Sequence, residues 1–224
     1  GVEVMYGKVA ATDVYGAEPL IFTTNDRNKP ETSFVMINDI HGRTDDIPQL
    51  LKVADYKNTD MVIFNGDMLS QLKNEEELFT GFMDVSIDMF AKETPMYYAR
   101  GNHETRGSFA IAFQDYFSPK QEHIYYMFRQ GPVCFVILDS GEDKPDSDLE
   151  YAGIADYDNY REEETLWLRS VVEENDFKQS SLRIAFLHIP PTIGNWHGNY
   201  HLQQTLLPVL NTAGIDLMLS GHTH

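Results

Sequence analysis

The chain has a single cysteine, which excludes an internal disulfide. Cys134 stands in the run PVCFVILD, and a short apolar run of this kind is typical of a buried strand. A lone buried thiol has no partner for dithiol chemistry. The sequence therefore gives no support to a redox function.

Basic residues are also scarce, because 17 Lys and Arg stand against 35 Asp and Glu. The formal net charge of −18 repels a polyanion at long range and disfavours nucleic acid as a partner. Long hydrophobic runs are missing too. No stretch approaches the ~20 apolar residues that a membrane-spanning helix needs, so we expect no transmembrane segment. The chain does not begin with Met, so a trimmed start and the loss of an export signal stay open.

What is present suits one sizeable globular domain, since 42% of the 224 residues are hydrophobic. The segments VEVMYGKVA and EPLIFTT predict two short strands near the start, and the polar stretch NDRNKPET predicts a linker. We therefore place a boundary near Ser33, which separates residues 1–32 from residues 33–224.

Beyond Ser33, short apolar runs alternate with segments of helical periodicity, and this alternation predicts an α/β domain. The expected strands are FVMI, MVIF, PMYYA, RIAFL and IDLML, and YMFRQGPVCFVILD predicts a hairpin. Thr44, followed by Asp45 and Asp46, predicts the start of a first helix. Apolar spacing predicts two further helices, one with a face of Leu78, Phe82, Val85 and Met89, the other with Trp167, Val171 and Glu174 close together.

Potential metal ligands follow each of the five expected parallel strands. Because open α/β sheets place their sites at the carboxyl ends of strands, we expect these side chains to meet. Residues two apart in extended backbone point the same way, so Asp39 with His41, and His222 with His224, are each placed to bind one ion. Glycine precedes a ligand position at 66, 101 and 221, where a backbone without Cβ can approach an ion closely. The segments that carry these ligands are NDIH, NGD, RGNHE, the single His188 and SGHTH.

These segments resemble the calcineurin-like metallophosphoesterase family, whose motifs run in the order DxH, GD, GNH followed by an acid, a lone His, and GHxH. The resemblance covers residues 33–224 and implies a mixed β-sheet sandwich flanked by helices, in four α/β/β/α layers. Family members continue past the last motif, so we expect a catalytic domain that is incomplete at its C-terminus. Some members follow a β-sandwich domain. Residues 1–32 would then be its last strands, or else a local hairpin on the edge of the catalytic domain.

The resemblance also implies two divalent metal ions (Mn, Fe, Zn, Co or Ni) that share a hydroxide, which attacks phosphorus. The implied ligands are Asp39, His41 and His224 for one ion, Asn102, His188 and His222 for the other, and Asp67 as the bridge between them. His103 would protonate the leaving group, and Glu104 would orient His103.

Three residues outside the ligand set are candidate substrate contacts. Arg100 precedes GNHE much as an arginine does in the protein serine/threonine phosphatases, where it anchors a phosphate oxygen, and Arg106 is a second candidate. His197 lies in NWHGNYHL, which forms either an aromatic substrate wall or an ordinary surface loop. Residues 140–164 are rich in acids but lack the register of a calcium loop, so we expect a solvated rim there.

Departures from the family motifs narrow the function. Purple acid phosphatases carry a tyrosine where this chain has Ser70, and protein serine/threonine phosphatases carry GDxxDRG where this chain reads GDMLSQL, so neither branch is favoured. We expect a hydrolase of a small phosphodiester or phosphomonoester. The alternatives are a nuclease of the same family and a non-catalytic, metal-stabilised binding scaffold. The intact His103 argues against the scaffold, because a protein without catalysis needs no proton donor. The remaining branch is often exported in bacteria, which favours an exported or periplasmic location over the cytoplasm.

Overall fold

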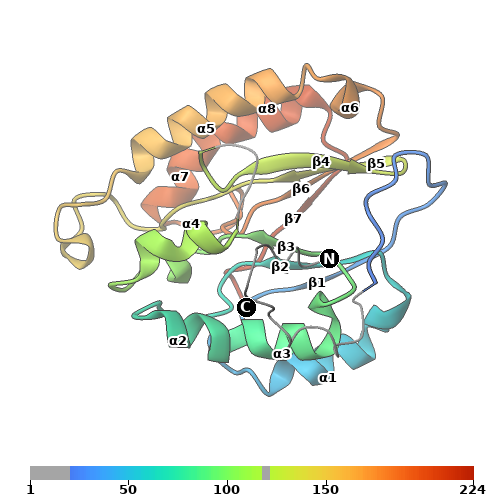
Figure 1. Ribbon diagram of the computed structural model, residues 1–224. Coiled ribbons are helices and arrows are strands. Elements are labelled where there is room, and N and C mark those ends of the chain that lie inside the picture. Colours follow the sequence, from blue (N-terminus) through green and yellow to red (C-terminus); the bar gives the residue numbers. More distant parts are fainter. Residues whose placement is uncertain (1–20, 118–121) are drawn as a thin grey trace, which may run out of the picture.

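Within residues 21–117 and 122–224, which the computed structural model describes, seven strands form two sheets (Figure 1). The first sheet has the order β1-β2-β3 and is parallel throughout. The second has the order β4-β5-β6-β7, in which β4 is antiparallel to β5 and the other pairs are parallel. The strands are β1 Phe34–Ile37, β2 Met61–Asn65, β3 Met96–Ala99, β4 Tyr126–Gln130, β5 Val133–Ile137, β6 Leu182–Phe186 and β7 Leu217–Leu219.

The sequence-based prediction of the strands is confirmed. The five apolar runs that precede ligand segments are β1, β2, β3, β6 and β7, and the predicted hairpin is β4 with β5. In the registers, Ile37 pairs with Phe64, and Phe186 pairs with Leu219, so neighbouring strands end nearly level. The parallel strands of each sheet therefore deliver the residues that follow them to one edge.

Helices cover the outer face of each sheet (Figure 1). The first sheet packs on α1 and on a continuous helix over residues 75–91, which contains two π-helical stretches. The second sheet packs on α5, α7 and α8. The helices are α1 Asp46–Val53, α2 Glu75–Leu78, η3 Phe79–Met83, α3 Asp84–Ser86, η4 Ile87–Ala91, α4 Phe113–Tyr116, α5 Tyr157–Val171, α6 Asn175–Lys178, α7 His197–Gln204 and α8 Leu206–Ala213, and the short 3-10 turns are η2 Tyr56–Asn58, η5 His103–Thr105, η6 Ala110–Ala112 and η7 Leu149–Tyr151. None of the described helices is long and apolar enough to cross a membrane.

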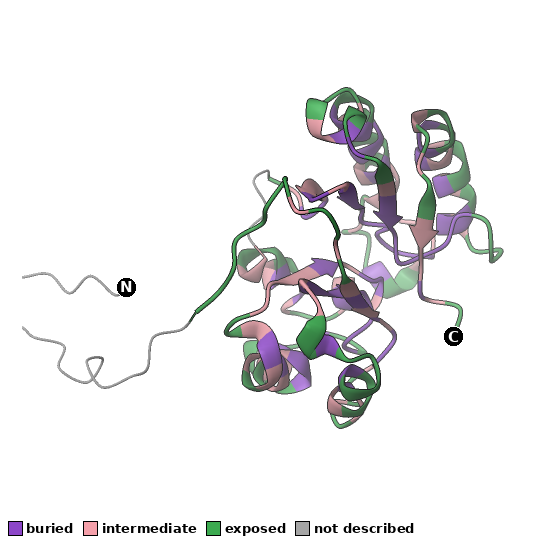
Figure 2. Ribbon diagram, turned by 90° about the vertical axis from the view of Figure 1, so that its right-hand side faces the viewer, coloured by how far each residue is buried: buried purple, intermediate pink, exposed green. Residues whose placement is uncertain are grey.

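A third apolar cluster fills the space between the two sheets. Phe34 lies edge-on to Phe135 and Phe186, with ring centroids 5.5 and 5.7 Å apart. Strands β2 and β5 are buried along their whole length because one face meets this cluster and the other meets helices. Figure 2 shows these buried strands between helices whose outer faces are exposed. The predicted four-layer α/β/β/α arrangement is confirmed.

Some local predictions were wrong. The first helix begins at Asp46, but neither Thr44 nor Asp45 caps it, because the Thr44 hydroxyl donates instead to the Gly81 carbonyl oxygen at 2.7 Å. The third predicted helix, α5, ends at Val171 before it reaches Glu174. In the segment EPLIFTT, the described residues 21–24 form no strand, and VEVMYGKVA lies outside the described residues.

The predicted linker contacts the main domain closely. The Asp26 carbonyl oxygen accepts a hydrogen bond from Gly131 N at 2.9 Å, and the Asp26 amide donates to the Gln130 side chain at 2.9 Å. Arg27 forms an ion pair with Asp176 at 2.6 Å. Residues 25–32 therefore lie against the β4–β5 turn, at the end of the sheets where β5 begins.

The buried thiol gives a first testable prediction. Cys134 is fully buried on β5, and burial, with a smaller contribution from Asp176, raises the pKa of its thiol to about 12. Only the thiolate reacts with disulfide reagents, so we expect no labelling of the native chain at pH 8 and one thiol per chain in denaturant. The time course of reaction with a chromogenic disulfide measures the labelling of the native and of the denatured chain. Rapid labelling of the native chain would contradict the buried position of Cys134.

Candidate metal centre

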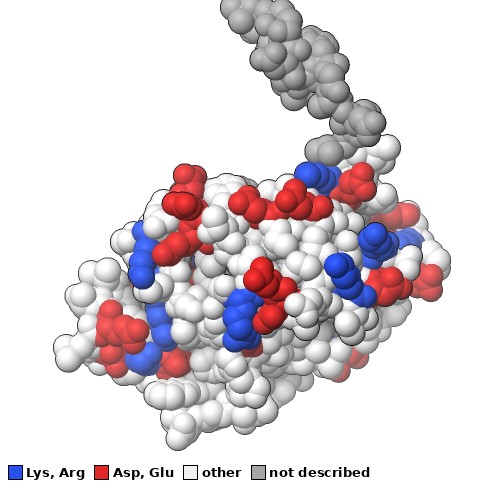
Figure 3. All heavy atoms as spheres, turned by 90° about the horizontal axis from the view of Figure 1, so that it is seen from below, with Lys and Arg blue, Asp and Glu red and all other residues white. Residues whose placement is uncertain are grey.

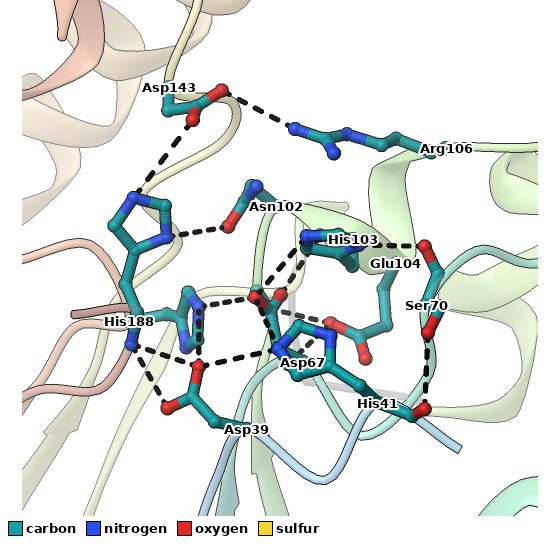
Figure 4. Close-up of polar contacts among 12 residues, drawn as sticks. Asp39, His41, Asp67, Ser70, Asn102, His103, Glu104, Arg106, Asp143 and His188 are labelled. Atoms are coloured by element: carbon teal, nitrogen blue, oxygen red, sulfur yellow. Dashed lines mark hydrogen bonds and ion pairs between the residues drawn. The ribbon is translucent and has the colours of Figure 1, made fainter. Parts of the chain in front are cut away.

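The carboxyl ends of the parallel strands in the two sheets lie side by side. The candidate ligands converge at this edge (Figure 4). The two sheets are joined there by hydrogen bonds from the Asn65 side chain to the Leu219 carbonyl oxygen at 3.2 Å and from His188 Nδ1 to the Asn65 carbonyl oxygen at 2.7 Å. The seven residues brought together are Asp39, His41, Asp67, Asn102, His188, His222 and His224. These are the seven residues that the sequence predicts as ligands.

One group of ligand atoms comes from the loop after β1 and from the end of the chain. Asp39, His41 and His224 offer atoms that all lie within 4.8 Å of one another. The two Nε2 atoms of His41 and His224 are 3.1 Å apart, and Asp39 Oδ1 lies 3.8 and 3.5 Å from them. Two imidazole nitrogens bound to one ion at about 2.0–2.1 Å would stand about 3 Å apart, so this spacing fits a shared ion.

A second group lies beside the first. Asp67, His188 and His222 offer ligand atoms within 4.8 Å of one another. His222 Nδ1 faces Asn102 Oδ1 at 3.0 Å, which adds an amide oxygen to the group. Imidazole, carboxylate and amide ligands of this kind accept several divalent transition metals.

Asp67 lies between the two groups. It belongs to the second, and with His41 of the first and His103 it forms a third group of possible ligands. Its Oδ2 lies 3.8 Å from His41 Nε2 and 3.0 Å from His188 Nε2, while its Oδ1 accepts the His103 backbone amide at 2.9 Å. Burial alone would raise the pKa of Asp67, but the nearby His188 imidazole brings it below the ordinary value. The carboxylate is therefore ionised, with one oxygen free to bridge two ions.

The donors around His188 fit a bound cation. His188 Nδ1 donates to a carbonyl oxygen, which leaves Nε2 as the ligand atom. This Nε2 is buried and, although 3.0 Å from Asp67, makes no hydrogen bond of acceptable geometry. Burial would lower the pKa of His188, yet Asp67 raises it to about 9. The surroundings of this pair thus favour positive charge, which a divalent ion supplies.

The extended backbone expected at Asp39 with His41 and at His222 with His224 is not found, and His222 and His224 fall in different ligand groups. Among the described residues, seven non-glycine residues have φ in the left-handed region, and five of them are candidate ligands: Asp39, His41, Asp67, His222 and His224. Asp and His tolerate this region better than most residues, but it still costs energy, and such strain concentrates at functional sites. The packing of the loops fixes the direction of each ligand.

Three glycines make the close packing possible, as the sequence predicts. A Cβ on Gly66 would lie 2.5 Å from His188 Nδ1, and one on Gly221 would lie 2.6 Å from Asp39 Oδ2. A Cβ on Gly101 would clash with Asp67 Oδ1 and lie 2.9 Å from Glu104 Oε2. No side chain fits at these positions without displacing a ligand.

The structure gives His103 a different orienting group from the predicted Glu104. His103 Nδ1 donates to the Ser70 carbonyl oxygen at 2.7 Å. The Glu104 carboxylate, which is fully buried, accepts hydrogen bonds from three backbone amides, those of Asp67, Leu69 and Gly101, at 2.9 to 3.1 Å. Glu104 therefore fixes the backbone of the ligand loops rather than the His103 ring.

Each of the three predicted substrate contacts is paired with a carboxylate. Arg100 Nη2 lies 2.7 Å from Asp139 Oδ2, and its guanidinium lies over the Tyr160 ring. Arg106 binds Glu142 through Nε and Nη2, at 2.6 and 3.0 Å. His197 Nε2 lies 2.8 and 2.9 Å from the two oxygens of Asp158. The structure brings none of the three into the ligand groups.

The prediction of a solvated rim was wrong at both ends of residues 140–164, since the last part belongs to α5 and buries Arg161 and Glu164 completely. Residues 140–143 are buried, including Glu142 and Asp143, whereas Leu149 and Ile154 further along are exposed. Asp146 satisfies the amides of Tyr157 and Asp158 at the start of α5, at 2.8 and 3.0 Å. Sequence reasoning missed these buried acids because they lie further along the loop after β5, beyond Asp139, in a run that reads as polar and solvated.

Comparisons with known proteins agree with this geometry. Residues 32–224 match the family model described as calcineurin-like phosphoesterase. Among solved structures, a purple acid phosphatase from yellow lupin (Lupinus luteus) seeds is similar with a TM-score of 0.58 and 16% identity, over 86% of this chain and 38% of that chain. A dimetal phosphatase from Danio rerio is similar with a TM-score of 0.55 and 16% identity, over 88% of this chain and 82% of that chain. Comparison with the curated proteins gave no significant match.

The glycine positions provide a test of the centre. We expect Gly101→Ala to lose bound metal, because the new methyl group must displace the Asp67 carboxylate. Gly153→Ala is a suitable control, since Gly153 has a φ of +73° but no atom within 4 Å of an added Cβ, so only the cost of left-handed backbone, about 1–2 kcal/mol, applies. Metal per chain by elemental analysis after dialysis distinguishes the two, and full retention by Gly101→Ala would contradict the assigned geometry.

Proposed function

The chain belongs to the calcineurin-like phosphoesterase family, and from this premise we propose that it is a metal-dependent hydrolase of phosphoesters. The observation that carries the proposal is the convergence of seven ligand residues in two groups with Asp67 between them. A single structural ion would need only one such group, whereas a shared carboxylate between two groups is the arrangement of a dinuclear hydrolase.

Asp39, His41 and His224 would hold one ion and Asn102, His188 and His222 the other, with Asp67 as the residue within reach of both. Two divalent ions bound there would lower the pKa of a shared water and neutralise the charge that develops on the phosphoryl oxygens. The ligand set accepts Mn, Fe, Zn, Co or Ni.

His103 is assigned the transfer of a proton to the leaving oxygen. Because Nδ1 donates to the Ser70 carbonyl oxygen, the ring presents Nε2 toward the centre, 3.9 Å from Asp67 Oδ2. The side chain is 27% exposed, so a substrate can reach it. A fixed imidazole at this position can give its Nε2 proton to an alkoxide as it leaves.

A small phosphodiester or phosphomonoester is the proposed substrate. Arg100 and Arg106 are both neutralised by carboxylates, so the side chains described here add no free basic groove for a polyanion. On the face that carries α1, α2 and α3, basic side chains lie next to acidic ones and form no continuous patch (Figure 3). These observations support a small substrate over the nuclease alternative.

The proposal is tested on purified protein loaded with Mn²⁺ or Zn²⁺. We expect about two ions per chain and hydrolysis of an aryl phosphodiester or phosphomonoester. A panel of monoesters, diesters, cyclic nucleotides and nucleotide-sugar pyrophosphates then ranks substrates by kcat/KM. Fewer than one ion per chain, or no hydrolysis of any of these compounds by the loaded chain, would contradict the proposed function.

Removal of His103 gives a second test. We expect His103→Ala to lower kcat about 10²–10⁴-fold for an alkyl phosphoester and much less for a nitrophenyl ester, whose leaving group needs no proton. Metal content should not change. His123→Ala is the control, because His123 is part-exposed, forms an ion pair with Glu163 and belongs to none of the ligand groups. Equal losses for both leaving groups would contradict the role as proton donor.

A further inference from the structure

We propose that Asp143 is a positioning residue of the metal centre, which holds the His222 ring in the direction that metal binding requires, and that Arg106 acts through Asp143 instead of binding phosphate. The inference rests on the proposed dinuclear site and adds to it a residue that lies outside every motif of the family resemblance.

The two nitrogens of the His222 ring face different groups. Nδ1 lies 3.0 Å from Asn102 Oδ1, within the second ligand group. Nε2 lies on the opposite side of the ring, 4.0 Å from Asp143 Oδ2 (Figure 4). A histidine that binds metal through one nitrogen generally donates its other N–H to a carboxylate or carbonyl, which fixes both tautomer and orientation. Asp143 is the carboxylate that faces this second nitrogen.

The Asp143 side chain is itself held in place. Its Oδ1 lies 3.4 Å from Arg106 Nη2 and 3.3 Å from Lys144 Nζ, so the cations engage the oxygen that does not face His222. Its backbone amide donates to Glu142 Oε2 at 3.2 Å, and its carbonyl oxygen accepts Gly198 N from the start of α7 at 2.8 Å. The residue is only 6% exposed. Oδ2 is thus left free and directed at His222.

Arg106 is held by the carboxylates of Glu142 and Asp143. Its guanidinium binds both oxygens of Glu142, which is fully buried, and also contacts Asp143. Burial would raise the pKa of Glu142, but Arg106, with Tyr151 and Thr105, lowers it, so the Glu142 carboxylate stays charged beside the guanidinium. A phosphate group would have to compete with two carboxylates for Arg106. Paired in this way, Arg106 serves to fix Asp143.

The test measures metal affinity in the absence of substrate. Apo protein is titrated with Zn²⁺ in competition with a chromophoric chelator, which gives a Kd for each ion. We expect Asp143→Ala to weaken about 10–100-fold the binding of one ion, the one assigned to Asn102, His188 and His222, and to leave the other Kd unchanged. Asp143→Asn should recover part of this loss, because its amide oxygen can also face the His222 Nε2–H. This variant has nearly the same shape as the native residue, so it still tests the inference if the alanine variant unfolds. Asp88→Ala removes the same charge from an 80% exposed side chain on the helix over residues 75–91 and should bind as the wild type does.

Arg106→Lys separates the two roles of Arg106, because lysine keeps the charge but cannot bridge Glu142 and Asp143 with the same fork. A positioning role predicts weaker Zn²⁺ binding, whereas a phosphate contact predicts a raised KM with unchanged Zn²⁺ binding. The inference is overturned if Asp143→Ala binds both ions within twofold of the wild type, or if Arg106→Lys alters KM alone. A wild-type chain that binds two ions and hydrolyses no phosphoester contradicts the proposed function and leaves the inference about Asp143 standing.

Discussion

The metal centre depends on the contacts of one buried carboxylate residue, Asp67. Its carbonyl oxygen accepts the His41 amide at 2.9 Å, its Oδ1 accepts the His103 amide at 2.9 Å, and its Oδ2 lies 3.0 Å from His188 Nε2. These partners come from loops after β1, β3 and β6, so both sheets are tied to the residue that follows β2. The side chain and the carbonyl group of Asp67 thus hold the loops after β1, β3 and β6 in place. These contacts also set the distance between the two ligand groups.

Beneath Asp67, the carboxylate of Glu104 provides a second layer of support. An ionised carboxylate in a fully buried position is costly, and burial, followed by the charge of Asp67, raises its pKa. The three amide donors that surround Glu104 offset this cost and would otherwise be unpaired. Glu104, which the motif suggests as a partner of His103, therefore holds the turns that carry the candidate ligands. The Ser70 carbonyl oxygen accepts the hydrogen bond from His103 instead.

The strands and the ligand set could be predicted from the sequence because both depend on local patterns. The apolar runs are continuous where both faces of a strand are buried, as in β2, and ligands directly follow such runs. The buried acids at Glu142 and Asp143 could not be found in this way, because they read as part of a long polar run and are buried only through contacts with Arg106 and the start of α7. The same holds at α5, whose first amides bond to Asp146, eleven residues before Tyr157 in the chain. The burial of Glu142 and Asp143 and the start of α5 depend on contacts between segments that are distant in sequence. Residue spacing within one segment cannot predict such contacts.

The left-handed backbone of the ligand loops restricts which residues can replace a ligand, quite apart from what the ion requires. At Asp39 and Asp67, a glutamate preserves the charge but lengthens the side chain and fits the φ of 57° and 55° poorly, whereas an asparagine preserves the backbone and loses the charge. Two independent requirements thus apply at Asp39 and Asp67: the residue must tolerate a left-handed backbone and must carry a carboxylate. Few residues other than the one present meet both requirements, whereas exposed positions on the outer helices are subject to neither.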